Sequence, residues 1–359
     1  MLKQLKALTL GCTAALALSA GPAQAADPFK VGFVYVGPIG DHGWTYRHDE
    51  GRKAVEAAFG DKVKTTYVEN VSEGPDAERV IRQLASSGHG LIFTTSFGFM
   101  NPTLKVAKKF PKVKFEHATG YKRTPNLSTY SGRFYEGRHV AGLIAGHMTK
   151  TNVIGYIASF PIPEVVRGIN AFTLALRSVN PKAEVKVVWV NTWYDPGKEG
   201  DAAKALIDQG ADVISQHTDS PAPLQVAESR GAFAIGQASD MKRFAPKAQL
   251  MAIVDDWNPY YVARTKAAME GTWKSQDTWD GIKPGMVVVA SINESLPDNV
   301  RAKAMQAVED LKSGKVHAFD GPVKDQSGKV RVPAGEHASD EMLLGMDWYV
   351  EGVQGKLPK

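Results

Sequence analysis

Aromatic side chains follow several short apolar segments of this chain, where a flat ligand would find stacking surfaces. Six of them stand just beyond predicted strands: Trp44, Tyr46, Phe97, Phe99, Trp193 and Tyr194. An aromatic ring that faces water at the end of a strand is unfavourable unless something flat covers it. Stacking of a nucleic-acid base on such a ring is worth about 1–3 kcal/mol. Packing between two domains is the alternative role. Because Trp44 and Trp193 occupy equivalent places in two similar units, we interpret this pair as a stacking site.

Polar side chains that suit a nitrogen heterocycle accompany these rings. The set predicted from the same strand ends is Asp41, Asp195, His217, Asp219 and Asp240. Carboxylates accept hydrogen bonds from ring N–H groups and from exocyclic amino groups. A further acidic stretch, Asp255-Asp256, is followed by Trp257. Since this stretch stands beside a predicted hinge crossing, we interpret Asp256 and Trp257 as hinge or ligand contacts rather than as acid–base residues.

Motifs for catalysis and metal binding are absent from the sequence. Gly37, Gly40 and Gly43 have the spacing G-x-x-G-x-x-G, which is not the dinucleotide fingerprint. The chain contains no G-x-x-x-x-G-K-[ST], G-x-S-x-G or H-E-x-x-H segment. A single cysteine excludes a disulfide scaffold and a cysteine-based zinc site. We therefore predict no catalytic residue, no metal and no cofactor.

Segments typical of strands and helices alternate in a way that brings these strand ends together. Predicted strands at 31–36 and 63–68 flank a helix at 44–59, and the pattern restarts with a strand at 153–158 after a seam near 149–152. The alternation predicts an α/β protein with two parallel sheets, each covered by helices on both faces. Ligands of such sheets lie beyond the carboxyl ends of the strands, where the residues above stand.

The pattern also predicts a division of the chain into two lobes. Residues 26–149 form the first lobe, to which 256–282 return, and residues 150–255 form the second lobe, to which 283–345 return. The last residues, 346–359, are predicted to be a C-terminal tail.

The first 25 residues have the features of a secretory signal peptide. Lys3 and Lys6 precede an apolar run at 8–20, and Ala23-Gln24-Ala25 is a small-x-small cleavage signal. Cys12 lies inside the apolar run, so lipidation is disfavoured and the chain cut after Ala25 has no cysteine. An exported protein without disulfides suits the periplasm of a Gram-negative bacterium. The formal charge of the whole chain, +5 over 359 residues, indicates no nucleic-acid partner.

An ordered set of motifs extends over essentially the whole chain after the signal peptide. It comprises Gly40-Asp41-His42-Gly43-Trp44, Glu136-Gly137, Pro163-Glu164 with Arg167-Gly168, Trp193-Tyr194-Asp195-Pro196 with Lys198 and Gly200, Gln209-Gly210-Ala211-Asp212-Val213-Ile214, and Trp348-Tyr349-Val350-Glu351-Gly352. In this set the chain resembles the basic-membrane-protein (BMP) family of ABC-transporter solute-binding proteins, of the type that binds purine nucleosides or bases. The resemblance implies the type I periplasmic-binding-protein fold, with two doubly wound lobes, a three-segment hinge and the ligand closed between the lobes. It also implies that Trp44 and Trp193 sandwich the base and that Asp41 takes the place of the first-loop aspartate.

Two departures from the family pattern concern the sugar. Nucleoside-binding members hold the ribose with an aspartate after a G-V-D-like strand end and with a lysine at the last hinge crossing. The matching positions here are Ala238 and either Asp256 or Trp257. The resemblance therefore implies a purine nucleobase such as adenine as ligand, with a nucleoside as the alternative.

Three kinds of function stay open at this point. The first is delivery of a purine to the permease of an ABC importer at the inner membrane, by a monomer whose lobes move freely. The second is a secreted purine-processing enzyme, a hydrolase or deaminase, for which the necessary motifs are absent. The third is a sensor that presents its closed form to a membrane receptor.

Overall fold

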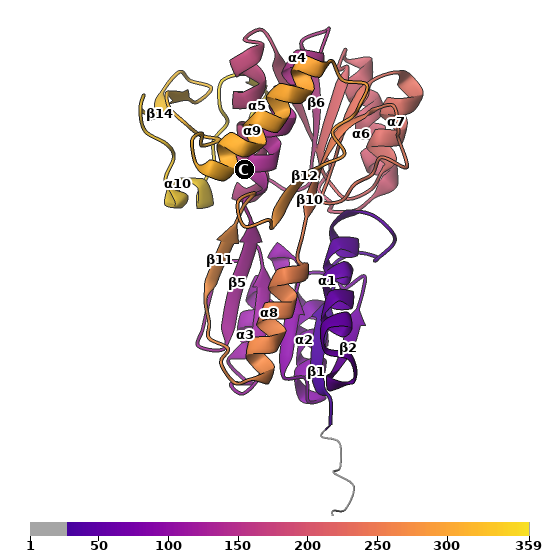
Figure 1. Ribbon diagram of the computed structural model, residues 1–359, viewed down its shortest axis with the longest axis vertical. Helices are drawn as coiled ribbons and strands as arrows, with labels where there is room; N and C mark the ends of the chain where they lie inside the picture. The colour runs from indigo at the N-terminus through magenta and orange to yellow at the C-terminus, as the bar shows by residue number, and fades with distance from the viewer. Residues whose placement is uncertain (1–26, 359) are drawn as a thin grey trace, which may run out of the picture.

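The computed structural model describes residues 27–358, which fold around two separate β-sheets stacked end to end (Figure 1). The first sheet has six strands in the order β11-β5-β4-β3-β1-β2, and all of its pairings are parallel. Its strands are β1 (Phe29–Val34), β2 (Val63–Val68), β3 (Leu91–Thr94), β4 (Lys114–Ala118), β5 (Leu127–Gly132) and β11 (Asp277–Asp280). The predicted signal peptide at 1–25 lies outside the described residues.

Helices cover both faces of the first sheet because its strands are apolar on both sides. Phe33 and Phe93 belong to the core on one face, whereas Val34 and Ile92 belong to the core on the other face. Helices α1 and α8 contact each other, and so do α2 and α3. Their bounds are α1 (Gly43–Phe59), α2 (Pro75–Ser86), α3 (Met100–Ala107) and α8 (Asn258–Met269), with short 3-10 turns η1 (Gly60–Lys62) and η2 (Phe97–Phe99).

The second sheet has seven strands in the order β12-β10-β9-β8-β6-β7-β15, and only the β10–β12 pairing is antiparallel. Its strands are β6 (Val153–Ala158), β7 (Glu184–Trp189), β8 (Val213–His217), β9 (Phe233–Gly236), β10 (Gln249–Asp255), β12 (Val287–Ala290) and β15 (Val353–Gln354). Its helices are α4 (Phe134–Met148), α5 (Pro163–Val179), α6 (Pro196–Asp208), α7 (Ala222–Arg230) and α9 (Asp298–Ser313). Both sheets therefore have the strand–helix alternation that the sequence predicts.

Helix α4 packs on the second sheet, so the chain first passes between the sheets at 132–134 and not at the predicted seam near 149–152. The reason is a row of small residues on α4. A Cβ atom on Gly142 would lie 2.2 Å from the backbone oxygen of Phe172 in α5, and one on Gly137 would lie 2.8 Å from Ile253 in β10. Only glycine permits this approach, which holds α4 against the second sheet. The later passages lie between β10 and α8 and between β11 and β12.

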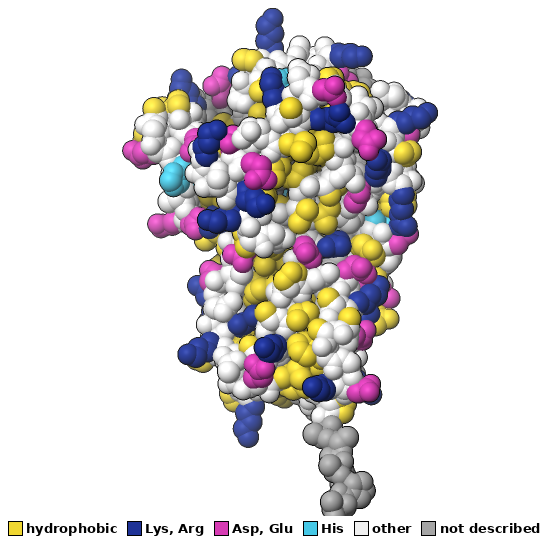
Figure 2. All heavy atoms as spheres, viewed as in Figure 1, with side chains coloured by type: hydrophobic (Ala, Val, Ile, Leu, Met, Phe, Trp, Pro, Cys, Tyr) yellow, Lys and Arg dark blue, Asp and Glu magenta, His cyan; other side chains and the backbone are white. Residues whose placement is uncertain are grey.

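The residues predicted as a C-terminal tail are packed against the second sheet. Strand β15 pairs with β7, and Tyr349 and Val350 are buried. Before them come the hairpin of β13 (Val323–Lys324) and β14 (Val330–Val332) and the short helix α10 (Asp340–Leu344). On the face shown in Figure 2, basic and acidic side chains are interspersed over both lobes. Within residues 27–358, no helix combines the length and apolar character needed to cross a membrane.

Burial keeps several histidines neutral, and His117 in β4 is the clearest of them. Its side chain is fully buried, Nδ1 lies 3.0 Å from the Thr94 hydroxyl, and desolvation lowers its pKa to about 3. An unfolded chain protonates histidine near pH 6.5. Below that pH the unfolded state therefore binds a proton that the folded state does not bind.

We expect the free energy of unfolding to fall as the pH drops below about 6.5, since each pKa unit is worth about 1.4 kcal/mol. For His117 alone this amounts to about 3 kcal/mol by pH 4.5. Urea unfolding of the wild type and of His117→Asn at pH 7.0 to 4.5 measures the effect. The variant should lose stability less steeply with falling pH, and equal slopes for the two proteins would contradict the assignment.

Candidate functional site

Two adjoining cavities lie between the lobes, at the carboxyl ends of the strands. The outer cavity has a volume of about 260 Å³ and the inner cavity a volume of about 30 Å³. Both are lined by Val36, Trp44, Trp193 and Asp219. The outer cavity adds Gly37, Pro38, Ile39, Gly40, His42, Thr45, Asn70, Glu73, Phe160, Asn191, Thr192 and Tyr194, and the inner cavity adds Ser96, Phe97, Thr119, Glu164, His217 and Gln237.

The start of helix α1 brings Trp44 to both cavities. Gly43, the first residue of the helix, has φ +78°, and a Cβ atom there would lie 2.6 Å from the backbone oxygen of Asp219 in the other lobe. A glycine is thus required for the helix to begin this close to the second lobe. The indole N–H of Trp44 donates to the backbone oxygen of Thr95 at 2.6 Å. Because that donor is used, Trp44 offers a ligand its ring rather than its N–H group.

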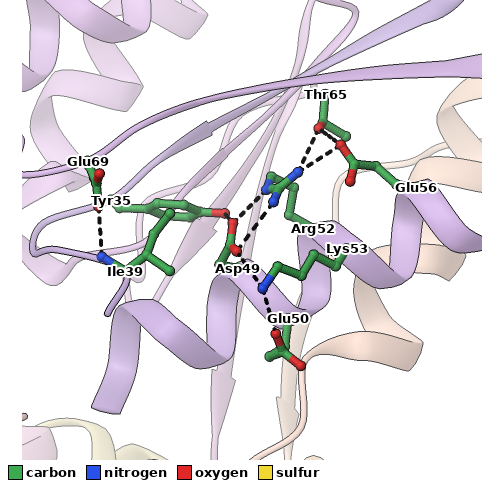
Figure 3. Close-up of polar contacts among 9 residues, drawn as sticks. All are labelled: Tyr35, Ile39, Asp49, Glu50, Arg52, Lys53, Glu56, Thr65 and Glu69. Carbon is green, nitrogen blue, oxygen red and sulfur yellow. Dashed lines mark hydrogen bonds and ion pairs between the residues drawn. The ribbon is translucent and has the colours of Figure 1, made fainter. Parts of the chain in front are cut away.

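A polar network anchors α1 to the neighbouring strand and to the loop after β1 (Figure 3). Arg52 donates to Asp49 at 2.6 Å and to Glu56 at 2.7 Å, and the Tyr35 hydroxyl of the loop after β1 donates to Asp49 at 3.3 Å. The backbone N–H of Ile39 donates to Glu69 at 2.8 Å, which fixes the loop that lines the outer cavity. The helix and this loop are therefore held by contacts that do not use the cavity side.

Trp193 reaches the cavities from the second lobe. Its ring lies 5.0 Å from that of Phe160, centroid to centroid, and its indole N–H donates to Glu73 of the first lobe at 3.3 Å. Glu73 also accepts from the Ser96 hydroxyl at 2.5 Å and from the backbone N–H of Gly98 at 3.1 Å. A carboxylate with these three donors joins the two lobes at the edge of the outer cavity.

Other contacts close the lobes around the cavities. The backbone N–H of Gly43 donates to the Ser239 hydroxyl at 2.7 Å, and Arg47 donates to the backbone oxygen of Asp255 at 2.6 Å. Asp41 forms an ion pair with Arg243 of the second lobe. A ligand between the lobes would therefore be enclosed by residues from both sides.

Buried polar groups lie at the inner cavity and around the residues that line it. His217 Nε2 lies 3.5 Å from a Glu164 oxygen, and burial lowers the pKa of this histidine. Burial, together with the charge of Glu199, raises the pKa of Asp219 well above its usual value. His217 Nδ1, Ser159 Oγ and two nitrogens of Arg138 have no hydrogen-bond partner among residues 27–358. Of these residues His217 lines the inner cavity, so its Nδ1 atom can recognise a polar ligand there without competition from a protein partner.

The structure brings six of the thirteen predicted site residues to these cavities: Trp44, Phe97, Trp193, Tyr194, His217 and Asp219. The aromatic residues Phe99 and Trp257 lie in the core instead, and both are fully buried. Phe99 belongs to the far face of the first sheet, and Trp257 stacks on His48 with ring centroids 4.8 Å apart. Tyr46, on α1, is half-buried and lines neither cavity.

The four remaining carboxylates have structural partners away from the cavities. Asp195 caps α6 by accepting from the backbone N–H of Lys198 at 3.0 Å. Asp240 accepts from Gln249 at 2.7 Å, and Asp256 accepts from the backbone N–H of Asn258 at 3.2 Å. Asp41 is exposed and holds Arg243, as described above.

Several cavity residues were not predicted as contacts. Glu164 and Gln237 come shortly after β6 and β9, so a stricter use of the strand-end rule would have included them. Glu73 lies in a loop without any motif, and nothing in the sequence marks it. Within the described part of the chain, no group of three or more His, Cys, Asp or Glu side chains could hold a metal ion.

Comparison with known proteins identifies relatives over most of the chain. Residues 29–326 match the family model Bmp, described as "ABC transporter substrate-binding protein PnrA-like". A purine-binding protein of Brucella abortus (strain 2308) is 58% identical over 339 residues, which cover 94% of this chain and 97% of that protein. A Haloferax volcanii protein, provisionally named as the glucose-binding protein of an ABC transporter, is 38% identical over 94% of this chain and 83% of its own length.

Solved structures with the same fold are more distant in sequence. A solute-binding protein of an ABC transporter system from Aeropyrum pernix K1 superposes with a TM-score of 0.69 at 18% identity, over 82% of this chain and 94% of that chain. A solute-binding protein of an ABC transporter system from Conexibacter woesei DSM 14684 gives a TM-score of 0.65 at 22% identity. The match covers 80% of this chain and 98% of that chain. These likenesses confirm the predicted α/β periplasmic-binding-protein fold.

Proposed function

The chain belongs to the Bmp family of PnrA-like ABC-transporter substrate-binding proteins, and from this premise we propose that it binds a purine nucleobase between its lobes. The family is one of binding proteins and not of enzymes, so a hydrolase or deaminase activity is set aside. The Brucella abortus relative is named as a purine-binding protein, which supports a purine as the ligand.

One observation carries the proposal: two indole rings, one from each lobe, line the same pair of cavities. Trp44 and Trp193 both border the outer and the inner cavity. A flat heterocycle between them would be stacked on both faces once the lobes close, and closure would remove water from it. Because such a ligand contacts both lobes, it favours the closed state over the open one.

Two buried residues support a nucleobase rather than a nucleoside. Ala238 is fully buried, has φ +57° and offers no side-chain hydrogen bond. Trp257 is also fully buried and packs edge-on against Trp44 with ring centroids 5.5 Å apart. Ala238 has no side-chain group that would hold a ribose hydroxyl, and Trp257 supplies no charged group in place of a lysine.

The family membership also supports a place of action and a partner. We propose that the protein is exported to the periplasm and, as a monomer, presents its closed form to the permease of an ABC importer. The four lobe-to-lobe contacts of Gly43, Arg47, Asp41 and Trp193 would then exist only in that closed form.

A panel of candidate ligands tests the proposal. We expect adenine or another purine base to raise the unfolding temperature, since a ligand at 100 times its dissociation constant stabilises a protein by about 2.7 kcal/mol. Thermal unfolding should be followed with purine bases, nucleosides, glucose and amino acids at equal concentration. Stabilisation by nucleosides alone would favour the alternative ligand class, and stabilisation by glucose but by no purine would overturn the proposal.

A further inference from the structure

We propose that Arg138 is a positioning residue that sets the hydrogen-bond polarity of the inner cavity, turning the Gln237 amide so that its NH₂ group faces the ligand. This inference rests on the proposed function, because it places the polar edge of the ligand at the inner cavity. The inner cavity would then offer a ligand one fixed donor, the NH₂ group of Gln237, and one fixed acceptor, Nδ1 of His217.

The first step is the orientation of Gln237. Arg138, on α4, donates from Nη2 to the amide oxygen of Gln237. A guanidinium group carries only donors, so the group of Gln237 that faces it must be the oxygen. The NH₂ group then points away from Arg138. Gln237 lines the inner cavity, and among residues 27–358 its NH₂ group donates no hydrogen bond.

The second step is the environment of Arg138 itself. Its side chain is 0% exposed, and its guanidinium group lies 5.7 Å from the centroid of the Tyr156 ring. Its Nε and Nη1 atoms have no hydrogen-bond partner among residues 27–358. Burying a charge without a contacting counter-charge is unfavourable. An apolar residue of similar size would pack the same place at lower cost. Arg138 lines neither cavity, so its donation to Gln237, which lines the inner one, is the contact that accounts for an arginine here.

The third step is the protonation state of His217. Its Nε2 atom faces Glu164 at 3.5 Å, and a carboxylate requires a donor, so Nε2 carries the proton. Burial is the largest influence on the pKa of His217 and lowers it, Glu164 raises it, and the charges of Arg138 and Arg167 lower it again. The net shift of the pKa is downward, which favours the neutral ring. Nδ1 is then a bare acceptor, and it is buried without a partner.

These steps define the edge of the ligand that fits. It carries an N–H donor for His217 beside a lone-pair acceptor for Gln237, as adenine does with its amino group and an adjacent ring nitrogen. Unsubstituted purine has the acceptor but not the amino donor. An unmatched buried donor or acceptor costs about 1–3 kcal/mol, which is about 5- to 150-fold in affinity.

The central test is the variant Gln237→Glu, which keeps the partner of Arg138 but replaces the donor at the cavity by a carboxylate oxygen. We expect adenine binding, measured by calorimetry, to weaken about 30-fold or more. The unfolding temperature of the free protein should be unchanged or higher, because the new carboxylate neutralises Arg138. A merely structural role of Gln237 would instead lower affinity and stability together.

A double-mutant cycle tests the role of Arg138. Arg138→Met should weaken adenine binding about tenfold in the wild-type background but not in the Gln237→Leu background, because Arg138 acts through Gln237. Arg138→Lys, which still donates to the amide oxygen, should restore most of the affinity. Arg177→Met is the control, since Arg177 lies on α5 of the second lobe, is partly exposed and lines neither cavity.

The outcomes separate this inference from the proposed function. Wild-type protein that binds adenine, with a Gln237→Glu variant that binds it equally well, would overturn the inference alone. An Arg138→Met effect that persists in the Gln237→Leu background would do the same. Wild-type protein that binds no purine would overturn the proposed function and this inference with it.

Discussion

Replacing Trp193 with alanine should weaken purine binding by about 1–3 kcal/mol, the value of one stacked base face. The side chain is half-buried and lines the cavities instead of belonging to the buried core, so the fold should remain intact. Its one hydrogen bond, to Glu73, joins the lobes, so its loss would also favour the open state. Trp193→Phe, which keeps a stacking ring, should lose less affinity than the alanine variant. Calorimetry with adenine measures each difference.

Trp44 gives the companion measurement on the other lobe. Trp44→Ala should weaken binding by a similar amount, but it also removes ring contacts with His48 and Trp257 and so should lower the unfolding temperature. Trp348→Ala is the matched control, because this indole lies near the C-terminus and lines neither cavity. Undiminished affinity in both cavity variants would show that the two indoles only pack the lobes.

Replacing Glu116 with leucine should destabilise the protein by about 3–5 kcal/mol, the largest effect we expect from a single substitution. Glu116 is fully buried in β4 and accepts from Arg264 at 2.5 Å, from the Trp273 indole at 2.6 Å and from the Tyr260 hydroxyl at 2.7 Å. Removing the carboxylate leaves a buried guanidinium group without its counter-charge. Urea unfolding at pH 7 measures the change.

The partner of Glu116 provides the check on this explanation. In the double variant Glu116→Leu/Arg264→Met no buried charge is left unpaired, so the loss should be smaller than in Glu116→Leu alone. Asp76→Ala, which removes an exposed ion pair with Arg79, should change stability little. A Glu116→Leu variant as stable as the wild type would show that Arg264 finds compensation elsewhere.

The sequence pattern was sufficient for most of the strands and helices and for the aromatic residues that line the cavities, because each depends on local order, but it did not predict β11 or β15. Runs of β-branched residues alternate with helical periods, and the residues after the strands must meet at one edge of a parallel sheet. Trp44, Trp193 and His217 follow from that rule alone. The sheet on which helix α4 packs could not be predicted in this way, since a helix that is apolar nearly all round can pack on either sheet. Only the contacts of Gly137 and Gly142 decide between the two sheets.

The sequence could not separate rings that line the cavities from rings that fill the core. Phe97 and Phe99 are two residues apart on one 3-10 turn, yet the first lines the inner cavity and the second is fully buried. Their residue type is the same, and the difference lies in the direction that the turn gives each side chain. Arg138 illustrates the same difficulty, because an arginine in a helix is ordinarily exposed and nothing local marks this one as buried.

The order of strands in the two sheets has a consequence for how the polypeptide matures. The first sheet ends in β11, at residues 277–280, and the second sheet ends in β15, at residues 353–354. Neither half of the molecule is therefore a contiguous piece of chain. The first sheet is complete once residue 280 is available, whereas the second sheet must wait for β15 near the C-terminus. A chain truncated by its last ten residues would therefore leave β7 as an open edge, while the first sheet would keep all of its strands.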